Sequence, residues 1–147
     1  MSEPPLKRDA ALLPLSWQHQ RGLRLARRIG LGEADIDDVE HAWDTELDAH
    51  FSAEEELLFS YSEDAHVARV KDDHEWLRAT YERLRSHPDD APLLLAFGAV
   101  LKAHIRFEER VWFQALQDSL GRERLESLHE RIRARLPDAQ DPPARLE

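Results

Sequence analysis

Hydrophobic side chains recur every three or four residues along most of this chain, which is the period of an α-helix with one buried face. The first such stretch covers about residues 16–29, and Gly30 and Gly32 end it. A longer second stretch begins after Asp35, whose side chain can cap a helix, and continues to Tyr61. This part of the chain therefore predicts two helices with a short connection between them.

Two more stretches with the same period follow. The third lies between a corner at residues 62–64 and the segment 87–92, where two prolines disfavour helix in the residues before them. The fourth runs from Leu94 through Val111 to Ala115 on its apolar face, before Gly121 ends the helix. Four successive helices with one apolar face each predict a helix bundle.

A shorter fifth helix is predicted over residues 122–136, where aliphatic side chains on one face would cap the bundle rather than bind a partner. The composition agrees with a helical protein, with 41% hydrophobic residues, 34% charged residues and only five glycines. We expect an all-α, up-down-up-down four-helix bundle over residues 12–136, with the short fifth helix at its C-terminal end. Residues 1–11 are expected to form a flexible arm and residues 137–147 a disordered tail.

Six polar side chains interrupt the apolar faces of the four main helices. Burying a carboxylate without a partner is costly, so a compensating charge is expected beside them. In an up-down bundle, residues equidistant from a turn lie at the same level, and the midpoints between these residues fall in the three predicted connections. The six side chains are therefore expected in one layer. They are His19, His50, Glu54, His74, His104 and Glu108.

The two halves of the chain repeat one pattern. Residues 50–59 and 104–113 share a histidine, two glutamates and a final phenylalanine, and another histidine precedes each segment at almost the same distance. A histidine and a glutamate four residues apart point in the same direction from a helix. A pseudo-twofold site for two metal ions follows. His19 and His50 would hold one ion, His74 and His104 the other, and Glu54 and Glu108 would bridge them.

The remaining candidate residues have simpler interpretations. Glu55 and Glu109 lie about 100° around the helix from the predicted ligands, so they are expected at the surface or beside the ligands, where either could add an oxygen. Three tryptophans are expected to pack in the core or to wall the site: Trp17, Trp76 and Trp112. Four histidines lie off the apolar faces and are expected in solvent: His41, His66, His87 and His129.

Charge and cysteine content restrict the function further. The formal net charge of −10 argues against nucleic acid and anionic membranes as partners, since both are polyanions. The absence of cysteine excludes a disulfide framework, a thiolate metal site and a thiol nucleophile. No segment resembles a signal peptide or reaches the length of a membrane span, so a cytoplasmic location is expected. The sequence does not identify a protein partner.

The six-residue pattern resembles the hemerythrin-like family, also called the HHE cation-binding domain. That family carries His, His-x-x-x-Glu, His and His-x-x-x-Glu on four successive helices, and the resemblance covers about residues 12–120. It implies two non-haem iron ions joined by two carboxylates and an oxo or hydroxo bridge, a centre that binds O2, peroxide or nitric oxide. By motif position, the six residues named above take the ligand roles. Imidazole and carboxylate ligands also suit Mn or Zn, so iron rests on the resemblance.

The sequence departs from the oxygen-carrying hemerythrins at two positions. Those carriers have a second histidine one turn along the third helix, where this chain has Arg78 after His74. Their bridging Asp lies one residue further along the fourth helix than Glu108 does here. With one histidine fewer, both metals would keep an exchangeable position, which suits redox chemistry or sensing better than oxygen transport. Arg78 is expected either in solvent or at the mouth of the pocket.

The sequence therefore favours a di-iron protein that binds O2 or related small molecules for a redox response or for sensing. Peroxidase-like or oxidase-like side activity is left open. One alternative is a metal store or iron-responsive binding module without turnover, and a second is a metal-free helical interaction protein. A ferritin-like oxidase fits less well, because that family places Glu before His in Glu-x-x-His.

Overall fold

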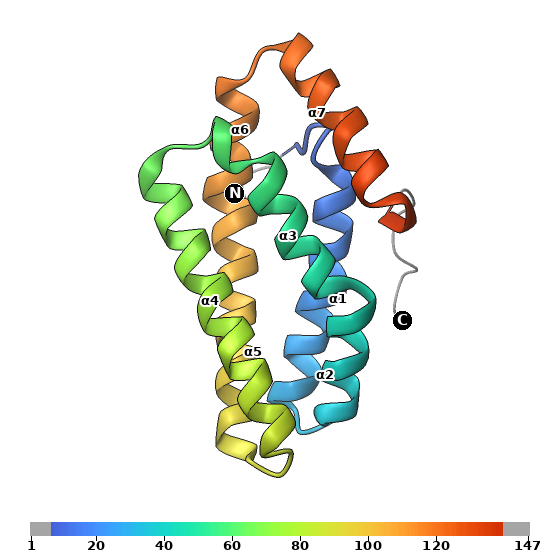
Figure 1. Ribbon diagram of the computed structural model, residues 1–147, viewed down its shortest axis with the longest axis vertical. Coiled ribbons are helices and arrows are strands. Elements are labelled where there is room, and N and C mark those ends of the chain that lie inside the picture. The colour runs from blue at the N-terminus through green and yellow to red at the C-terminus, as the bar shows by residue number, and fades with distance from the viewer. Residues whose placement is uncertain (1–6, 140–147) are drawn as a thin grey trace, which may run out of the picture.

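The computed structural model describes residues 7–139, and this range consists of helices and short connections without a β-strand. Four long helical rods run alternately up and down, and a shorter helix lies across one side at the top (Figure 1). The elements are α1 (Leu13–Gly30), α2 (Ile36–Ala42), η1 (Trp43–Leu47), α3 (Asp48–Leu57), η2 (Phe59–Tyr61), α4 (Asp64–Ser86), α5 (Ala91–Phe107), η3 (Glu108–Trp112), α6 (Phe113–Ser119), α7 (Arg122–Arg135) and η4 (Pro137–Ala139). The predicted all-α bundle with a short C-terminal helix is confirmed.

Local sequence signals explain where the first two rods begin. Helix α1 starts at Leu13, a little earlier than the apolar period predicts, because Pro14 occupies its first turn, where the fixed φ of proline suits a helix. The predicted cap at Asp35 is confirmed. Its side chain accepts a hydrogen bond from the backbone N–H of Asp38 at 3.2 Å, and the Asp38 side chain accepts one from the Asp35 N–H at 3.0 Å.

Two of the rods contain a π-helical turn that the three-four period does not reveal. In the second rod η1 joins α2 to α3, and in the fourth rod η3 joins α5 to α6. A π turn contains extra residues and so rotates the side chains that follow it. For this reason the prediction that Val111 faces the core is wrong. Val111 is 42% exposed, whereas the adjacent Trp112 and Phe113 are both fully buried.

The apolar core consists of two clusters with the polar layer between them. The upper cluster includes Leu12, Leu58 and Trp112 and extends to the buried face of α7, which packs over the bundle as predicted. The lower cluster includes Trp43 and Phe97. On each long rod, the predicted metal ligands lie between residues of the two clusters. Most of the apolar side chains that stabilise the fold are therefore packed above and below a single layer of polar side chains.

The three tryptophans that the sequence offered as core or wall residues differ in burial. Trp112 is fully buried and donates a hydrogen bond from its ring N–H to the Ser62 hydroxyl at 2.8 Å. Trp17 is half-buried, and Trp76 lies at the surface with 38% of its area exposed. Of these three tryptophans, only Trp112 therefore lies fully inside the core.

The described ends of the chain are in contact with the bundle. In the predicted arm, Ala11 is 1% exposed, and the Arg8 guanidinium donates to the Gln117 side chain of α6 at 3.1 Å. In the predicted tail, Ala139 of η4 is also 1% exposed. The remainder of the arm, residues 1–6, and of the tail, residues 140–147, lies outside the described residues.

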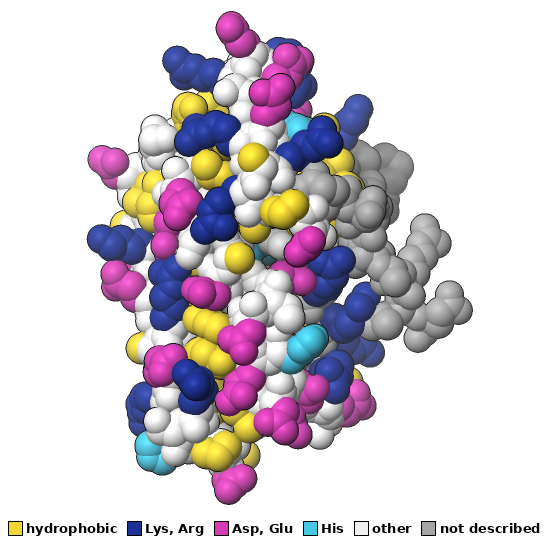
Figure 2. Space-filling model, turned by 45° about the vertical axis from the view of Figure 1, so that its right-hand side comes forward, with side chains coloured by type: hydrophobic (Ala, Val, Ile, Leu, Met, Phe, Trp, Pro, Cys, Tyr) yellow, Lys and Arg dark blue, Asp and Glu magenta, His cyan; other side chains and the backbone are white. Residues whose placement is uncertain are grey.

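The surface carries acidic and basic side chains in alternation. On the face shown in Figure 2, Asp and Glu lie interspersed with Lys and Arg, and hydrophobic areas between them are small. Within residues 7–139, none of the helices combines the length and apolar character that a membrane span requires.

Helices α1 and α5 approach closely because two glycines face the neighbouring helix. A Cβ added to Gly98 would lie 2.9 Å from Cγ2 and 3.2 Å from Cβ of Ile29. One added to Gly22 would lie 2.7 Å from Cδ1 of Ile105, which is the flexible end of that side chain. The Ile29 atoms that would be met are Cβ and a group attached to it, close to the backbone, so they have less freedom to move than Cδ1 at the end of Ile105.

We expect Gly98→Ala to lower the free energy of unfolding by about 1 kcal/mol, because overpacking costs about 1–3 kcal/mol and the gain in helix propensity returns up to about 1. Gly22→Ala is expected to be closer to neutral. Gly30→Ala is the matched control, since a Cβ there meets nothing within 4 Å. Urea unfolding of the three variants measures these differences, and equal stability of Gly98→Ala and Gly30→Ala would contradict the packing argument.

Candidate metal centre

The structure brings all six predicted residues together in the layer between the two core clusters. His19 comes from α1, His50 and Glu54 from α3, His74 from α4, His104 from α5 and Glu108 from the start of η3. None of the six is more than 3% exposed. Their side-chain atoms form two groups of four that share Glu54 and Glu108.

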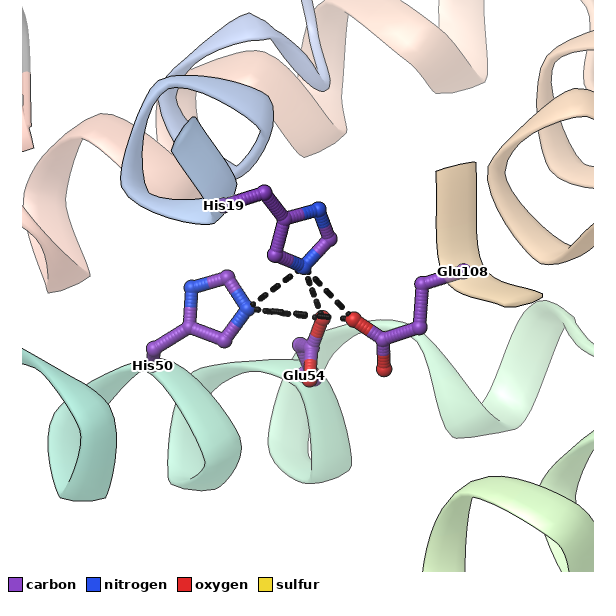
Figure 3. A group of neighbouring side chains, drawn as sticks. All are labelled: His19, His50, Glu54 and Glu108. Atoms are coloured by element: carbon purple, nitrogen blue, oxygen red, sulfur yellow. Dashed lines mark hydrogen bonds and ion pairs between the residues drawn. The ribbon is translucent and has the colours of Figure 1, made fainter. Parts of the chain in front are cut away.

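The first group joins His19, His50, Glu54 and Glu108, whose polar atoms converge on one point (Figure 3). The Nε2 atom of His19 lies 2.7 Å from Oε1 of Glu108 and 3.7 Å from Oε2 of Glu54. The Nε2 atom of His50 lies 3.0 Å from the same Glu54 oxygen and 3.8 Å from the same Glu108 oxygen. The two Nε2 atoms are 3.0 Å apart.

The second group repeats this arrangement with the other two histidines and the other two carboxylate oxygens. The Nε2 atom of His74 lies 3.1 Å from Oε1 of Glu54 and 3.9 Å from Oε2 of Glu108. The Nε2 atom of His104 lies 3.0 Å from Oε2 of Glu108. Each glutamate thus directs one oxygen to each group, which is how a carboxylate bridges two ions.

These separations fit a metal ion at the centre of each group. Two ligand atoms that are each about 2.1 Å from one ion lie about 3.0–3.4 Å apart in octahedral or tetrahedral geometry. Three buried atoms of the two groups make no well-directed hydrogen bond within the described chain, although each lies 3.0 Å from a polar atom of the same group: Oε2 of Glu54, Nε2 of His104 and Oε2 of Glu108. A buried polar atom that lacks such a bond is costly, and a cation would satisfy all three.

Every histidine of the two groups donates its Nδ1–H to an acceptor oxygen on a neighbouring helix. Such a bond leaves the lone pair of Nε2 directed at the shared interior and holds the ring in place. The pairs are His19 with Glu109 and His74 with Glu55, each at 2.7 Å, His50 with Gln18 at 2.7 Å, and His104 with Asp73 at 2.9 Å.

Sequence reasoning placed Glu55 and Glu109 at the surface or beside the ligands, and the structure shows them beside the ligands. It missed Gln18 and Asp73. The available signal was their position, because each directly precedes a predicted ligand in the first or third helix. Arg78 is half-buried and donates to both oxygens of Glu55, at 2.7 and 3.1 Å, so it supports this outer layer of hydrogen bonds.

The four histidines that the sequence assigned to solvent lie outside the core. His41 and His87 are exposed, and His66 and His129 are half-buried. None of them belongs to either group of potential ligands in residues 7–139.

A small cavity of about 10 Å³ lies beside the two groups, lined in part by His19, His50 and His104. A much larger groove of about 630 Å³ runs between α1 and α5, and its lining includes none of the six residues. We assign the chemistry to the layer beside the small cavity, because this layer holds the six buried His and Glu side chains.

A family model described as the hemerythrin HHE cation-binding domain matches residues 15–116 and 65–146 of the chain. The first match spans more than half of the sequence and contains all six residues of the two groups. No curated protein and no solved structure matches the chain.

When no ion is bound, neighbouring carboxylates raise the pKa values of the buried histidines. Burial lowers the pKa of His19, but hydrogen bonds to Glu108 and Glu109 outweigh it and raise the pKa well above its ordinary value. Burial likewise lowers the pKa of His104, and Glu108 and Asp73 raise it to about 10. Burial raises the pKa of Glu108, yet His104 and its other partners hold it well below the usual range. In the metal-free centre the neighbouring carboxylates therefore favour the protonated form of these two histidines.

This arrangement predicts how the stability of the metal-free chain depends on pH. A histidine titrates near pH 6.5 when unfolded and, in the case of His104, at about 10 when folded. Its stabilising effect is complete below about pH 6.5 and is lost as the pH rises toward the folded pKa. We expect the free energy of unfolding to fall by more than about 1 kcal/mol between about pH 6.5 and 9.5, since one pKa unit corresponds to about 1.4 kcal/mol.

Urea unfolding of chelator-treated protein at the two pH values measures this effect. The control variant His66→Gln should show the same fall, because His66 is outside the centre. A metal-free chain whose stability is constant or increases over this range would contradict the pairing of imidazolium with carboxylate.

Proposed function

The chain belongs to the hemerythrin HHE cation-binding family, and we propose that it binds two non-haem iron ions and uses them to respond to O2, nitric oxide or peroxide. The family match and the buried His/Glu groups indicate a metal-binding site. The observation that carries the finer proposal is the sharing of Glu54 and Glu108 between two groups of four ligand atoms.

The donor set supports iron as the ion. Each group offers two imidazole nitrogens and two carboxylate oxygens, a mixture that suits Fe and also Mn or Zn. The chain contains no cysteine, so thiolate ligands take no part. Iron has the additional property that a bound pair of ferrous ions can supply electrons to a small oxidant.

Two buried phenylalanines hold histidine ligands in place and keep water away from the centre. Phe51 stacks on the His74 ring at a centroid distance of 4.2 Å, and Phe113 stacks on the His19 ring at 5.2 Å. Both phenylalanines are at most 1% exposed. Together with the Nδ1 hydrogen bonds, these contacts fix the imidazole planes and exclude water from the ligand side.

The size of the adjacent cavity supports a small molecule as the exchangeable ligand. Its volume of about 10 Å³ is close to the minimum that a single water molecule needs. Leu47, Leu101 and Ile105 form apolar parts of its lining. A cavity of this size has no room for an organic substrate, which leaves ligands as small as O2, nitric oxide or peroxide as the candidates.

A metal store without turnover is the second candidate, and the near-complete burial of all six residues favours it. A store would load with metal and leave O2 and peroxide unchanged. The two candidates therefore differ in the response of the loaded protein and agree in its metal content.

We expect anaerobically reduced, iron-loaded protein to change its absorption spectrum on mixing with O2, nitric oxide or peroxide. Glu54→Gln should abolish this response and reduce the iron content below two ions per chain, because one oxygen of each group is altered. Glu56→Gln is the matched control on the same helix, since its side chain is 58% exposed and pairs only with Arg135 among the described residues. Stopped-flow spectroscopy with iron analysis measures both. If none of the three molecules changes the absorption spectrum of the iron-loaded protein, the proposed response is excluded and a metal store is favoured.

Metal affinity should fall as the pH falls, because protons and metal ions compete for the same Nε2 atoms. The raised histidine pKa values extend this competition to neutral pH. We expect at least about a tenfold loss of apparent affinity per pH unit between about pH 8 and 6, which corresponds to one displaced proton. Competition with a chelator at several pH values measures the slope. A slope of zero, or a thermal unfolding midpoint unchanged by removing the metal, would contradict coordination through these imidazoles.

A further inference from the structure

The two halves of the centre are almost identical in their outer hydrogen bonds, with one exception. His19 and His74 each donate to a glutamate, both at 2.7 Å. His50 and His104 also occupy equivalent positions, but their acceptors differ in charge. The acceptor of His50 is the neutral amide oxygen of Gln18, and the acceptor of His104 is a carboxylate oxygen of Asp73.

We propose that this difference makes the two metal positions unequal, so that the ion between His74 and His104 is held more tightly than the ion between His19 and His50. The inference rests on the proposed function, in which each group holds one ion. Gln18 and Asp73 act as positioning residues that set the affinities through the imidazoles they contact.

A carboxylate acceptor strengthens an imidazole ligand more than an amide does. The charged oxygen draws the Nδ1 proton toward itself and increases the electron density at Nε2, the atom that faces the metal. Loss of such an outer partner typically costs about 10–100-fold in metal affinity. The His74 and His104 group has two carboxylate acceptors, whereas the His19 and His50 group has one.

The cations around these acceptors do not favour one group over the other. Glu109, the only carboxylate acceptor of the first group, receives hydrogen bonds from Ser16 at 2.7 Å and from Arg8, whose side chain is only 8% exposed. The arginines that bond Glu55 and Asp73 are more open to solvent, with Arg78 at 34% and Arg69 at 45% exposed. Arg78 nevertheless makes the closer contacts, with hydrogen bonds to Glu55 at 2.7 and 3.1 Å, whereas Arg8 reaches Glu109 at 3.5 Å. The inequality of the two groups therefore rests on the acceptors Gln18 and Asp73.

One further acid near the first group does not restore the balance. Glu46 lines the small cavity beside His19 and His50, but its Oε2 atom pairs with Arg21 at 3.3 Å. It accepts no hydrogen bond from either imidazole among the contacts of the described residues. Its charge is partly offset by Arg21 and acts on the two imidazoles through space, without a hydrogen bond to either ligand.

Unequal affinity has a functional consequence. When iron is scarce the chain would hold a single ion between His74 and His104, and the second ion would enter only as the supply rises. The first group provides two of the three histidines that line the small cavity, so the more loosely held ion would also be the one beside this cavity. The response to O2 or peroxide would then depend on iron supply.

The test is a metal titration of the metal-free full-length chain with Co²⁺ in the presence of a competing chelator. Wild-type protein should bind two equivalents in two steps that differ at least about tenfold in affinity. Crystals loaded with one equivalent should show the anomalous signal of cobalt between His74 and His104. This location does not depend on any variant being folded.

Two substitutions test whether Gln18 and Asp73 cause the difference in affinity between the two steps. Asp73→Asn should weaken the tighter step about 10–100-fold, and Gln18→Glu should strengthen the weaker step. The controls are their exposed neighbours, Asp72→Asn and Gln20→Glu, which should leave both steps unchanged. Unfolding curves of the metal-free variants separate a loss of affinity from a loss of fold.

The possible failures are distinct. Wild-type protein that binds no Co²⁺ in the centre would remove the proposed function together with this inference. Two steps of equal affinity, or a single ion found between His19 and His50, would overturn the inference and leave the two-metal site intact. A matched loss in Asp73→Asn and Asp72→Asn would show that the effect is general electrostatics and would also overturn the assigned role of Asp73.

Discussion

The burial of six ionisable side chains in one layer is the constraint on which the rest of the structure depends. Four imidazoles and two carboxylates lie between two apolar clusters with almost no access to water. Such groups are tolerated only when their charges are matched, and two arrangements meet that condition here. In the metal-free chain protons on the imidazoles would balance the charges, and in the loaded chain metal ions would do so, both at the same Nε2 atoms. We therefore expect the stability of the fold to depend on the occupancy of its centre.

The outer hydrogen bonds turn this cluster of charges into a directed set of ligands. Each Nδ1–H is held by an oxygen from a neighbouring helix, so all four Nε2 atoms face inward. The three carboxylate acceptors also accept hydrogen bonds from Arg8, Arg69 and Arg78, which links the centre to the surface. Because the two halves of the chain repeat the pattern, the single difference between Gln18 and Asp73 carries information about function.

Much of this arrangement could be predicted from the sequence, and the reasons for the misses are physical. The three-four period located the helices, and the six polar residues on apolar faces located the layer, because burial restricts which residues those positions accept. The π turn at η3 was not visible in the period, and so Val111 was placed in the core. Gln18 and Asp73 were missed because which helix an outer side chain reaches depends on helix rotation and packing, which spacing along the chain does not give.

The central claim is that cations, held by shared glutamates, compensate the buried charges. The most direct measurement is an anomalous difference map from crystals of fully iron-loaded protein. The account predicts two peaks about 3.5–4 Å apart, one in each group of four ligand atoms, with Glu54 and Glu108 lying between them. A single peak, or iron found only on surface carboxylates while the six side chains remain hydrogen-bonded to one another, would contradict it.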